Sequence, residues 1–121
     1  MSEKTDNIKR IKLLITIVER GSGDRVIKFY RKNGITFNMV SPGYGTAGPE
    51  VMHYLGLTDY EKDIILSIIT EDRVSETINK TRYYFDLDRP GNGIVFAIPI
   101  CGVSGPLALK YISGLQFQER S

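Results

Sequence analysis

Three short segments of the chain are rich in apolar residues, and they limit the fold more than any other feature. They are IKLLITIVE (11–19), KDIILSIIT (62–70) and IVFAIPI (94–100). Isoleucine, leucine and valine dominate them, and β-branched residues favour strands. A weaker strand is expected at 36–40, where Asn38 and Met39 dilute the β propensity.

Two predicted helices separate these strands. Residues 21–24 break the first strand and offer N-cap side chains, and a helix follows through Asn33. A second helix begins near Asp72 and carries apolar residues on one face: Val74, Ile78 and Phe85. The order β-α-β-β-α-β is the ferredoxin-like pattern, an α+β fold with both helices on one face of a four-stranded antiparallel sheet. We therefore expect one domain over 11–121 behind a flexible tail, 1–10.

The predicted sheet is apolar on both faces. We expect one set of side chains to face the helices: Ile11, Leu13, Ile15, Ile64, Leu66, Ile68, Ile94, Phe96 and Ile98. The opposite face then carries Leu14, Thr16, Val18, Ile65, Ser67, Ile69, Val95 and Ala97. A sheet face exposed to water should be mostly polar, and this one is not. Such a surface is typical of protein–protein contacts, so we expect a homo-oligomer that buries the bare sheet faces.

Composition argues against several function classes. The single cysteine, Cys101, excludes an internal disulfide, and the single histidine, His53, excludes a catalytic triad or a pair of imidazole metal ligands. The sequence offers no nucleophile–base pair, so we expect a protein that is not an enzyme. Recognition of RNA on a sheet of this topology requires aromatic side chains on the central strands, which are absent, so nucleic acid is not an expected partner. The net charge is only +2. The charged N-terminus lacks the features of a signal peptide, so we expect a cytoplasmic protein. Because the chain has one cysteine and one histidine, we also expect it to bind no metal.

A long connection joins the second and third strands. Its sequence is SPGYGTAGPEVMHYLGLTDY (41–60), whereas most connections are four to six residues long. A short helix expected within it exposes Met52, Tyr54 or Leu55 unless these side chains dock on something. The segment is either a surface excursion that packs on its own subunit or a mobile arm that binds a partner protein.

The segment RPGNGIVF (89–96) leads into the last strand. Gly91, Asn92 and Gly93 can direct successive backbone N–H groups toward an anion, and Arg89 or Lys62 can add positive charge. The alternative is a plain helix-to-strand turn, because Asn-Gly dipeptides are common turn formers.

In this arrangement the chain resembles the P-II nitrogen-regulator superfamily, and in particular its divergent P-II-like members. The resemblance covers about residues 11–100. Gly43-Tyr44-Gly45 is similar to the Gly-Phe-Gly that opens the family's arm, and Gly91-Asn92-Gly93-Ile94-Val95-Phe96 takes the last six places of its second loop. Lys62 matches a basic phosphate contact of the family.

The resemblance implies a homotrimer that binds an adenine nucleotide between subunits. Its arm, about 43–61, would then control a membrane transporter or a metabolic enzyme in nitrogen metabolism. The implied ligand-binding residues are Gly43, Gly45, Thr46, Lys62, Arg89, Gly91, Asn92 and Gly93, and the implied partner-binding residues are Met52, Tyr54 and Leu55.

The sequence also departs from the family at residues that would hold phosphate. Ile94 stands where the family's second loop has a lysine, and Thr46-Ala47 replaces an Arg-Gln pair. These changes leave the identity of the effector open. The alternative is a structural trimer similar to the CutA-type proteins, without nucleotide sensing.

Overall fold

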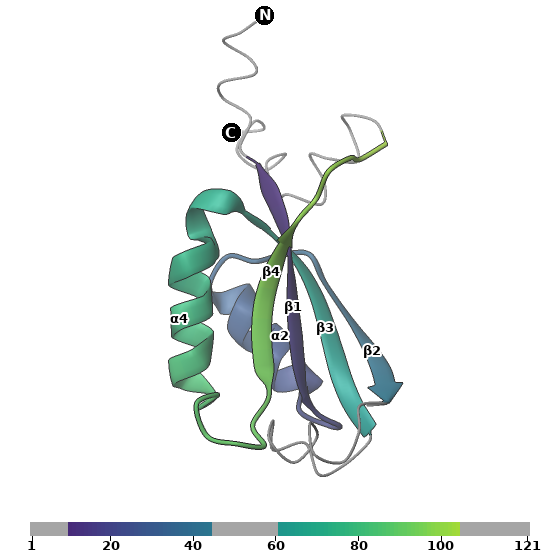
Figure 1. Cartoon of the computed structure of the whole chain (residues 1–121), viewed down its shortest axis with the longest axis vertical. Coiled ribbons are helices and arrows are strands. Elements are labelled where there is room, and N and C mark those ends of the chain that lie inside the picture. The colour runs from purple at the N-terminus through teal and green to yellow at the C-terminus, as the bar shows by residue number, and fades with distance from the viewer. Residues whose placement is uncertain (1–9, 45–60, 105–121) are drawn as a thin grey trace, which may run out of the picture.

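The computed structural model describes residues 10–44 and 61–104. Along this part of the chain lie the following elements: β1 (Ile11–Glu19), α2 (Gly23–Lys32), β2 (Asn38–Tyr44), β3 (Glu61–Thr70), the 3₁₀ turn η1 (Glu71–Arg73), α4 (Val74–Tyr84) and β4 (Ile94–Pro99). The strands form one sheet in the order β2-β3-β1-β4, and every neighbouring pair is antiparallel (Figure 1). The predicted α+β, ferredoxin-like βαββαβ pattern is therefore confirmed. Neither of the two α-helices described is long and apolar enough to cross a bilayer.

The pairing of β1 with β3 and β4 determines which side chains share a face of the sheet. Ile15 lies opposite Leu66 on β3 and Phe96 on β4. Directly opposed residues of an antiparallel pair point to the same face, so these three side chains form one row. The next residue on β1, Thr16, belongs to a row on the other face, with Ile65 on β3.

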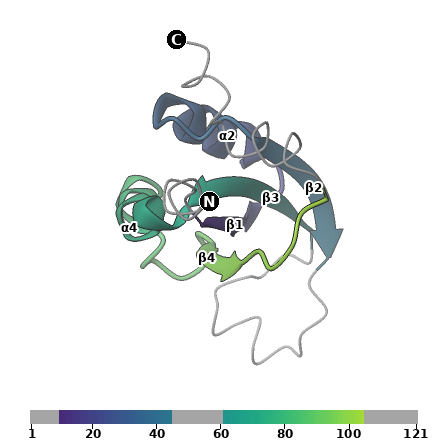
Figure 2. The same ribbon diagram turned by 90° about the horizontal axis from the view of Figure 1, so that it is seen from above.

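Both helices cover the sheet face that was predicted to be bare, so the predicted assignment of the faces is wrong. Figure 2 shows α2 and α4 on the same side of the curved sheet. The buried core between the helices and the sheet comprises Leu14, Val18, Val26, Tyr30, Ile35, Ile65 and Ile69. The residues expected under the helices lie on the face that no described helix covers. That face, which we call the open face, carries Leu13, Ile15, Ile17, Met39, Ile64, Leu66, Ile68, Ile94, Phe96 and Ile98.

The covered face includes two polar side chains that are buried and hydrogen-bonded, Thr16 and Ser67. Thr16 is fully buried, and its hydroxyl lies 2.7 Å from the hydroxyl of Tyr30 on α2. Ser67, also fully buried, donates to Asn38 Oδ1 at 2.6 Å. A buried hydroxyl is tolerated when it has a hydrogen-bond partner. These two polar residues are therefore compatible with the buried layer between the sheet and the helices.

The second strand differs most from its prediction. It was expected at 36–40, but β2 continues to Tyr44 and includes Pro42 and Gly43. β2 lies at the edge of the sheet and pairs only with β3. Proline is tolerated in an edge strand, where its missing N–H does not break the ladder. The first residues of the predicted arm therefore belong to the sheet, and residues 45–60 of that arm lie outside the described part of the chain.

The start of α2 is capped by a residue from a distant strand. The Ser22 side chain, at the N-cap position, makes no capping hydrogen bond. Instead Asp63 Oδ2 on β3 accepts hydrogen bonds from the backbone N–H groups of Gly21 at 2.8 Å and Gly23 at 3.0 Å. Arg20 Nε lies 3.4 Å from the other carboxylate oxygen of Asp63. Asp63 thus ties the β1–α2 turn to the middle of the sheet and satisfies N–H groups that a helix start leaves open.

Tyr30 is the described residue whose ionisation is coupled most clearly to folding. Burial raises the pKa of its hydroxyl above the ordinary value of 10.0, while hydrogen bonds with Thr16 and Thr81 oppose that rise. The unfolded chain loses this proton near pH 10, whereas the folded chain retains it to higher pH. The free energy of unfolding therefore falls as the pH rises above 10, by up to about 1.4 kcal/mol per pH unit for one proton.

We predict that Tyr30→Phe lowers the free energy of unfolding by about 1 kcal/mol at pH 8, because Thr16 loses its partner. The difference in the free energy of unfolding between the native protein and the variant should narrow above pH 10, since only the native protein loses stability by ionisation of this hydroxyl. Urea unfolding of both proteins between pH 8 and pH 11 measures it. A difference that stays constant over that range would contradict the coupling.

Candidate functional site

With the exception of Arg89, the predicted ligand-binding residues that the structure describes gather at one end of the sheet. Gly43 on β2 lies opposite Lys62 on β3, and Lys62 lies opposite Glu19 on β1. The 91–93 loop enters β4 beside Ile17, two residues before Glu19. Neighbouring strands are about 4.8 Å apart, so this row spans roughly 15 Å from β2 to β4. Five predicted site residues lie outside the described part of the chain: Gly45, Thr46, Met52, Tyr54 and Leu55.

Lys62 is a buried cation at the centre of this row. The residue is only 4 % exposed, and its position two residues from Ile64 places it on the open face. Its backbone carbonyl accepts a hydrogen bond from Arg20 Nε at 3.3 Å. Its ammonium group makes no ion pair with any acidic residue in the described ranges. A buried charge is costly unless a counter-charge or hydrogen-bond acceptor compensates it, so this position favours an anionic oxygen nearby.

The 91–93 loop is held in a defined shape by its own backbone and by Asn92. Gly91 and Gly93 have φ angles of 97° and 121°, values that favour glycine. The Asn92 side-chain amide donates to the carbonyls of Asp86 at 2.9 Å and Phe85 at 3.4 Å. The Asn92 backbone N–H donates to the Arg89 carbonyl at 3.2 Å.

Asn92 therefore serves mainly to shape the loop. Its backbone N–H and its side-chain amide are both directed to carbonyls of the α4–β4 connection. The backbone N–H groups of Gly91 and Gly93 have no backbone partner within the part of the chain that is described. Those two groups are the better candidates for contact with an anion.

Two of the glycines also have packing reasons to be glycine. A Cβ atom at Gly93 would collide with the backbone carbonyl oxygen of Ile17 and lie 3.0 Å from Val18 Cγ1. A Cβ atom at Gly43 would collide with the Cδ1 atom of Ile64. Close approach of chain segments thus explains these glycines without a ligand. The loop is both a tight structural turn and a candidate anion site.

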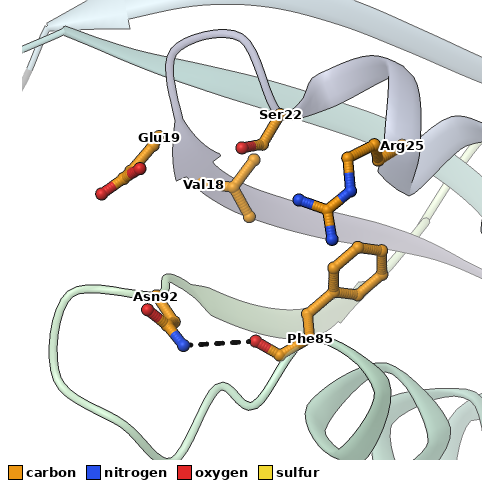
Figure 3. A pocket seen from close by; sticks show the side chains of 6 residues that line it. All are labelled: Val18, Glu19, Ser22, Arg25, Phe85 and Asn92. Atoms are coloured by element: carbon orange, nitrogen blue, oxygen red, sulfur yellow. Dashed lines mark hydrogen bonds between the residues drawn. The ribbon is translucent and has the colours of Figure 1, made fainter.

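A small pocket of about 200 Å³ adjoins the 91–93 loop on the helix side (Figure 3). Its lining residues come from the β1–α2 turn and the α4–β4 connection: Val18, Glu19, Ser22, Arg25, Phe85 and Asn92. Arg25 lies over the Phe85 ring, 5.5 Å from its centroid, and Glu19 lies on the opposite side of the pocket. The pocket offers a cation, a carboxylate and a hydroxyl, but no nucleophile–base pair.

The sequence did not predict that Arg25 on α2 lines this pocket. Arg25 and Phe85 are far apart in the chain, and only the packing of the two helices brings them together. The predicted cation Arg89 lies elsewhere, on the surface, where its Nε is 3.7 Å from Asp86 Oδ2. An exposed pair of this kind contributes little to stability, so Arg89 can turn toward a ligand at small cost.

Solved structures of P-II proteins resemble this fold. Arabidopsis thaliana PII bound to citrate is 20% identical over 76% of this chain and 78% of that one, with a TM-score of 0.57. The ATP complex of B. subtilis GlnK is 16% identical over 76% of this chain and 84% of that one, with a TM-score of 0.58. No protein-family model matches the sequence, and no curated protein does. At these identities the likeness concerns the fold alone, and the chain has a P-II-like fold.

We predict that Gly93→Ala lowers the free energy of unfolding by about 2 kcal/mol or more, because the new Cβ meets the Ile17 carbonyl at a φ that alanine rarely adopts. Gly102→Ala is the matched control, since a Cβ there meets no atom within 4 Å. Denaturant unfolding compares the two variants with the native protein. Equal stability of the variants would show that the loop does not pack on β1 as described.

Proposed function

We propose that the chain is a P-II-like regulatory protein of the cytoplasm. In this proposal three copies assemble, a small effector binds in the clefts between them, and the arm that follows β2 controls a partner transporter or enzyme, with nitrogen metabolism as the favoured context. The observation that carries the proposal is the row of Gly43, Lys62 and the 91–93 loop at one end of a P-II-like sheet. The protein is proposed to be a regulator without catalytic activity of its own.

The open face supports assembly. Its edge strand β4 exposes large apolar side chains: Ile94 at 38 %, Phe96 at 37 % and Ile98 at 41 %. They follow one another at every second position and form one continuous stripe. Water contact with such a stripe is unfavourable by roughly 25 cal/mol per Å² of apolar surface, so a contact that buries it would be stabilised. A second copy is the proposed cover because identical faces can bury one another in a closed assembly.

We predict that the native protein sediments as a trimer of about 41 kDa, three times the chain mass of 13.6 kDa. Phe96→Glu should dissociate it, because the assembly would otherwise bury a charge without a partner. Tyr83→Glu is the control, since Tyr83 is 89 % exposed on α4, away from the open face. Analytical ultracentrifugation measures the mass of the native protein and of each variant. A native protein of 13.6 kDa at micromolar concentration would refute the assembly.

Effector binding is proposed at the end of the sheet that holds Lys62. The ammonium group of the buried Lys62 makes no ion pair within 10–44 and 61–104, and the N–H groups of Gly91 and Gly93 have no backbone partner in those ranges; together they suit a carboxylate or phosphate oxygen. The comparison structures were solved with an anion of each type, citrate in one and ATP in the other. An adenine nucleotide is the first candidate. Ile94, which replaces a lysine of the family pattern, makes a ligand with fewer phosphates the second.

A thermal-shift series with ATP, ADP, AMP, cyclic dinucleotides and 2-oxoglutarate tests this site. We predict that one of them stabilises the protein, by about 2.7 kcal/mol when its concentration is a hundred times its dissociation constant. Lys62→Met keeps the apolar stem and removes the charge, and it should weaken binding at least tenfold. Arg89→Gln should weaken it less, because Arg89 is exposed.

Arg82→Gln is the matched control for the arginine. Like Arg89, Arg82 is exposed and close to an aspartate, with its Nε 4.0 Å from Asp88 Oδ2, but it belongs to the last turn of α4 and was not a predicted ligand-binding residue. It should leave the thermal shift unchanged. If Lys62→Met retains the full shift, the effector does not bind at Lys62. If none of the ligands stabilises the protein, the CutA-type alternative, a structural trimer without nucleotide sensing, is favoured.

A further inference from the structure

The outer surface of the helical layer carries a set of cations without acidic partners. Helix α2 contains Asp24 and four basic residues, Arg25, Lys28, Arg31 and Lys32, and all of these are exposed. None of the four basic side chains makes an ion pair within the described ranges. The whole chain has a net charge of only +2, so this helix concentrates positive charge that the rest of the protein largely balances.

Three of these cations border a groove between α2 and α4. The groove has a volume of about 320 Å³, and its lining residues are Arg25, Lys28, Phe29, Lys32, Asn33 and Tyr84. Positions 25, 28 and 32 follow one another along one side of α2, and at 1.5 Å per residue they span roughly 10 Å. Arg31 lies on the same helix but does not line the groove.

The floor of the groove is aromatic. The Phe29 and Tyr84 rings are stacked, with centroids 4.5 Å apart and an interplanar angle of 17°. Tyr84 remains 62 % exposed, so much of this stacked pair is open to a partner. A cationic edge beside an exposed aromatic floor offers charge contacts and an apolar contact in one place.

Next to Phe29 and Asn33, the surface between the two helices carries charges of both signs. The charged residues that line the adjoining hollow are Arg73, Glu76 and Lys80, and Lys80 Nζ forms an ion pair of 3.1 Å with Glu76 Oε2. A nucleic-acid backbone carries a negative charge at every phosphate and would meet Glu76 there. A protein segment can place acidic residues on the cationic edge and other residues beyond it. The mixed charge therefore favours a protein partner.

We propose that this α2–α4 groove binds an acidic amphipathic helix of a partner protein. Carboxylates at positions i, i+3 and i+7 of that helix would match the spacing of Arg25, Lys28 and Lys32, and one apolar side chain would rest on the Phe29–Tyr84 floor. This surface lies on the helices, whereas the proposed effector site lies around Lys62 on the open face, so it does not depend on the proposed function. Of the three groove cations, Arg25 also lines the pocket beside the 91–93 loop.

The test uses the full chain and a fluorescein-labelled, alanine-rich 18-residue peptide with Glu at i, i+3 and i+7 and Phe at i+4. Fluorescence anisotropy at low salt should show binding that 0.5 M NaCl largely abolishes. The same peptide with Gln in place of Glu should bind at least tenfold more weakly. The double variant Lys28→Glu/Lys32→Glu should also weaken binding of the acidic peptide at least tenfold, and Tyr84→Ala should weaken it several-fold.

Two matched controls separate the groove from general charge and hydrophobicity. Arg31→Glu makes the same charge change as either single variant, Lys28→Glu or Lys32→Glu, near the end of the same helix, so it shares any effect on helix stability. Tyr83→Ala removes a tyrosine that is 89 % exposed but does not line the groove. Both should change the dissociation constant less than twofold.

The proposal is overturned if the acidic peptide does not bind at 1 mM, or if Arg31→Glu weakens binding as much as either groove lysine reversed alone. It is also overturned if an 18-residue oligothymidylate binds more tightly than the peptide and shows the same sensitivity to the groove variants, because the surface would then recognise nucleic acid.

Discussion

The fold depends on a central strand that is apolar on both sides. β1 is hydrogen-bonded to β3 along one edge and to β4 along the other, so it occupies the interior of the sheet. Its alternate residues, such as Leu14 and Ile15, are directed to opposite faces. The two helices cover only the face of Leu14. The remaining apolar face therefore requires another cover, and the proposed assembly and the proposed clefts between subunits follow from that requirement.

Three of the strand positions were predictable because short apolar runs rich in β-branched residues are typical of buried strands. β1 was predicted with its observed bounds, and β3 and β4 each differ from prediction by one residue. The face that the helices cover was not predictable from the same signal, since Leu13 and Leu14 are equally apolar. The structure decides between the two faces by distant contacts, among them the hydrogen bond between Thr16 and the buried Tyr30 hydroxyl on α2.

The candidate site shows the same division between local and distant effects. The glycines at 91 and 93 were identified from the sequence, and both have positive φ angles that favour glycine. The role of Asp63 was missed, because its capping of α2 depends on β3 lying beside the β1–α2 turn. The contact of Arg25 with Phe85 was missed for the same reason. The order of motifs along the chain indicated where ligands could bind, whereas the groups that shape the loops come from other elements.

The proposed assembly requires the open face to be buried between copies of the chain. Solvent paramagnetic relaxation of the isoleucine and valine methyl groups, with a soluble nitroxide, measures this directly in the unmodified protein. In a single chain Ile94, Ile98 and Val103 are similarly exposed, at 38 %, 41 % and 38 %. The account predicts strong enhancement for Val103 and little for Ile94 and Ile98. Equal enhancement at all three residues would show that the open face is in contact with water and would contradict the claim.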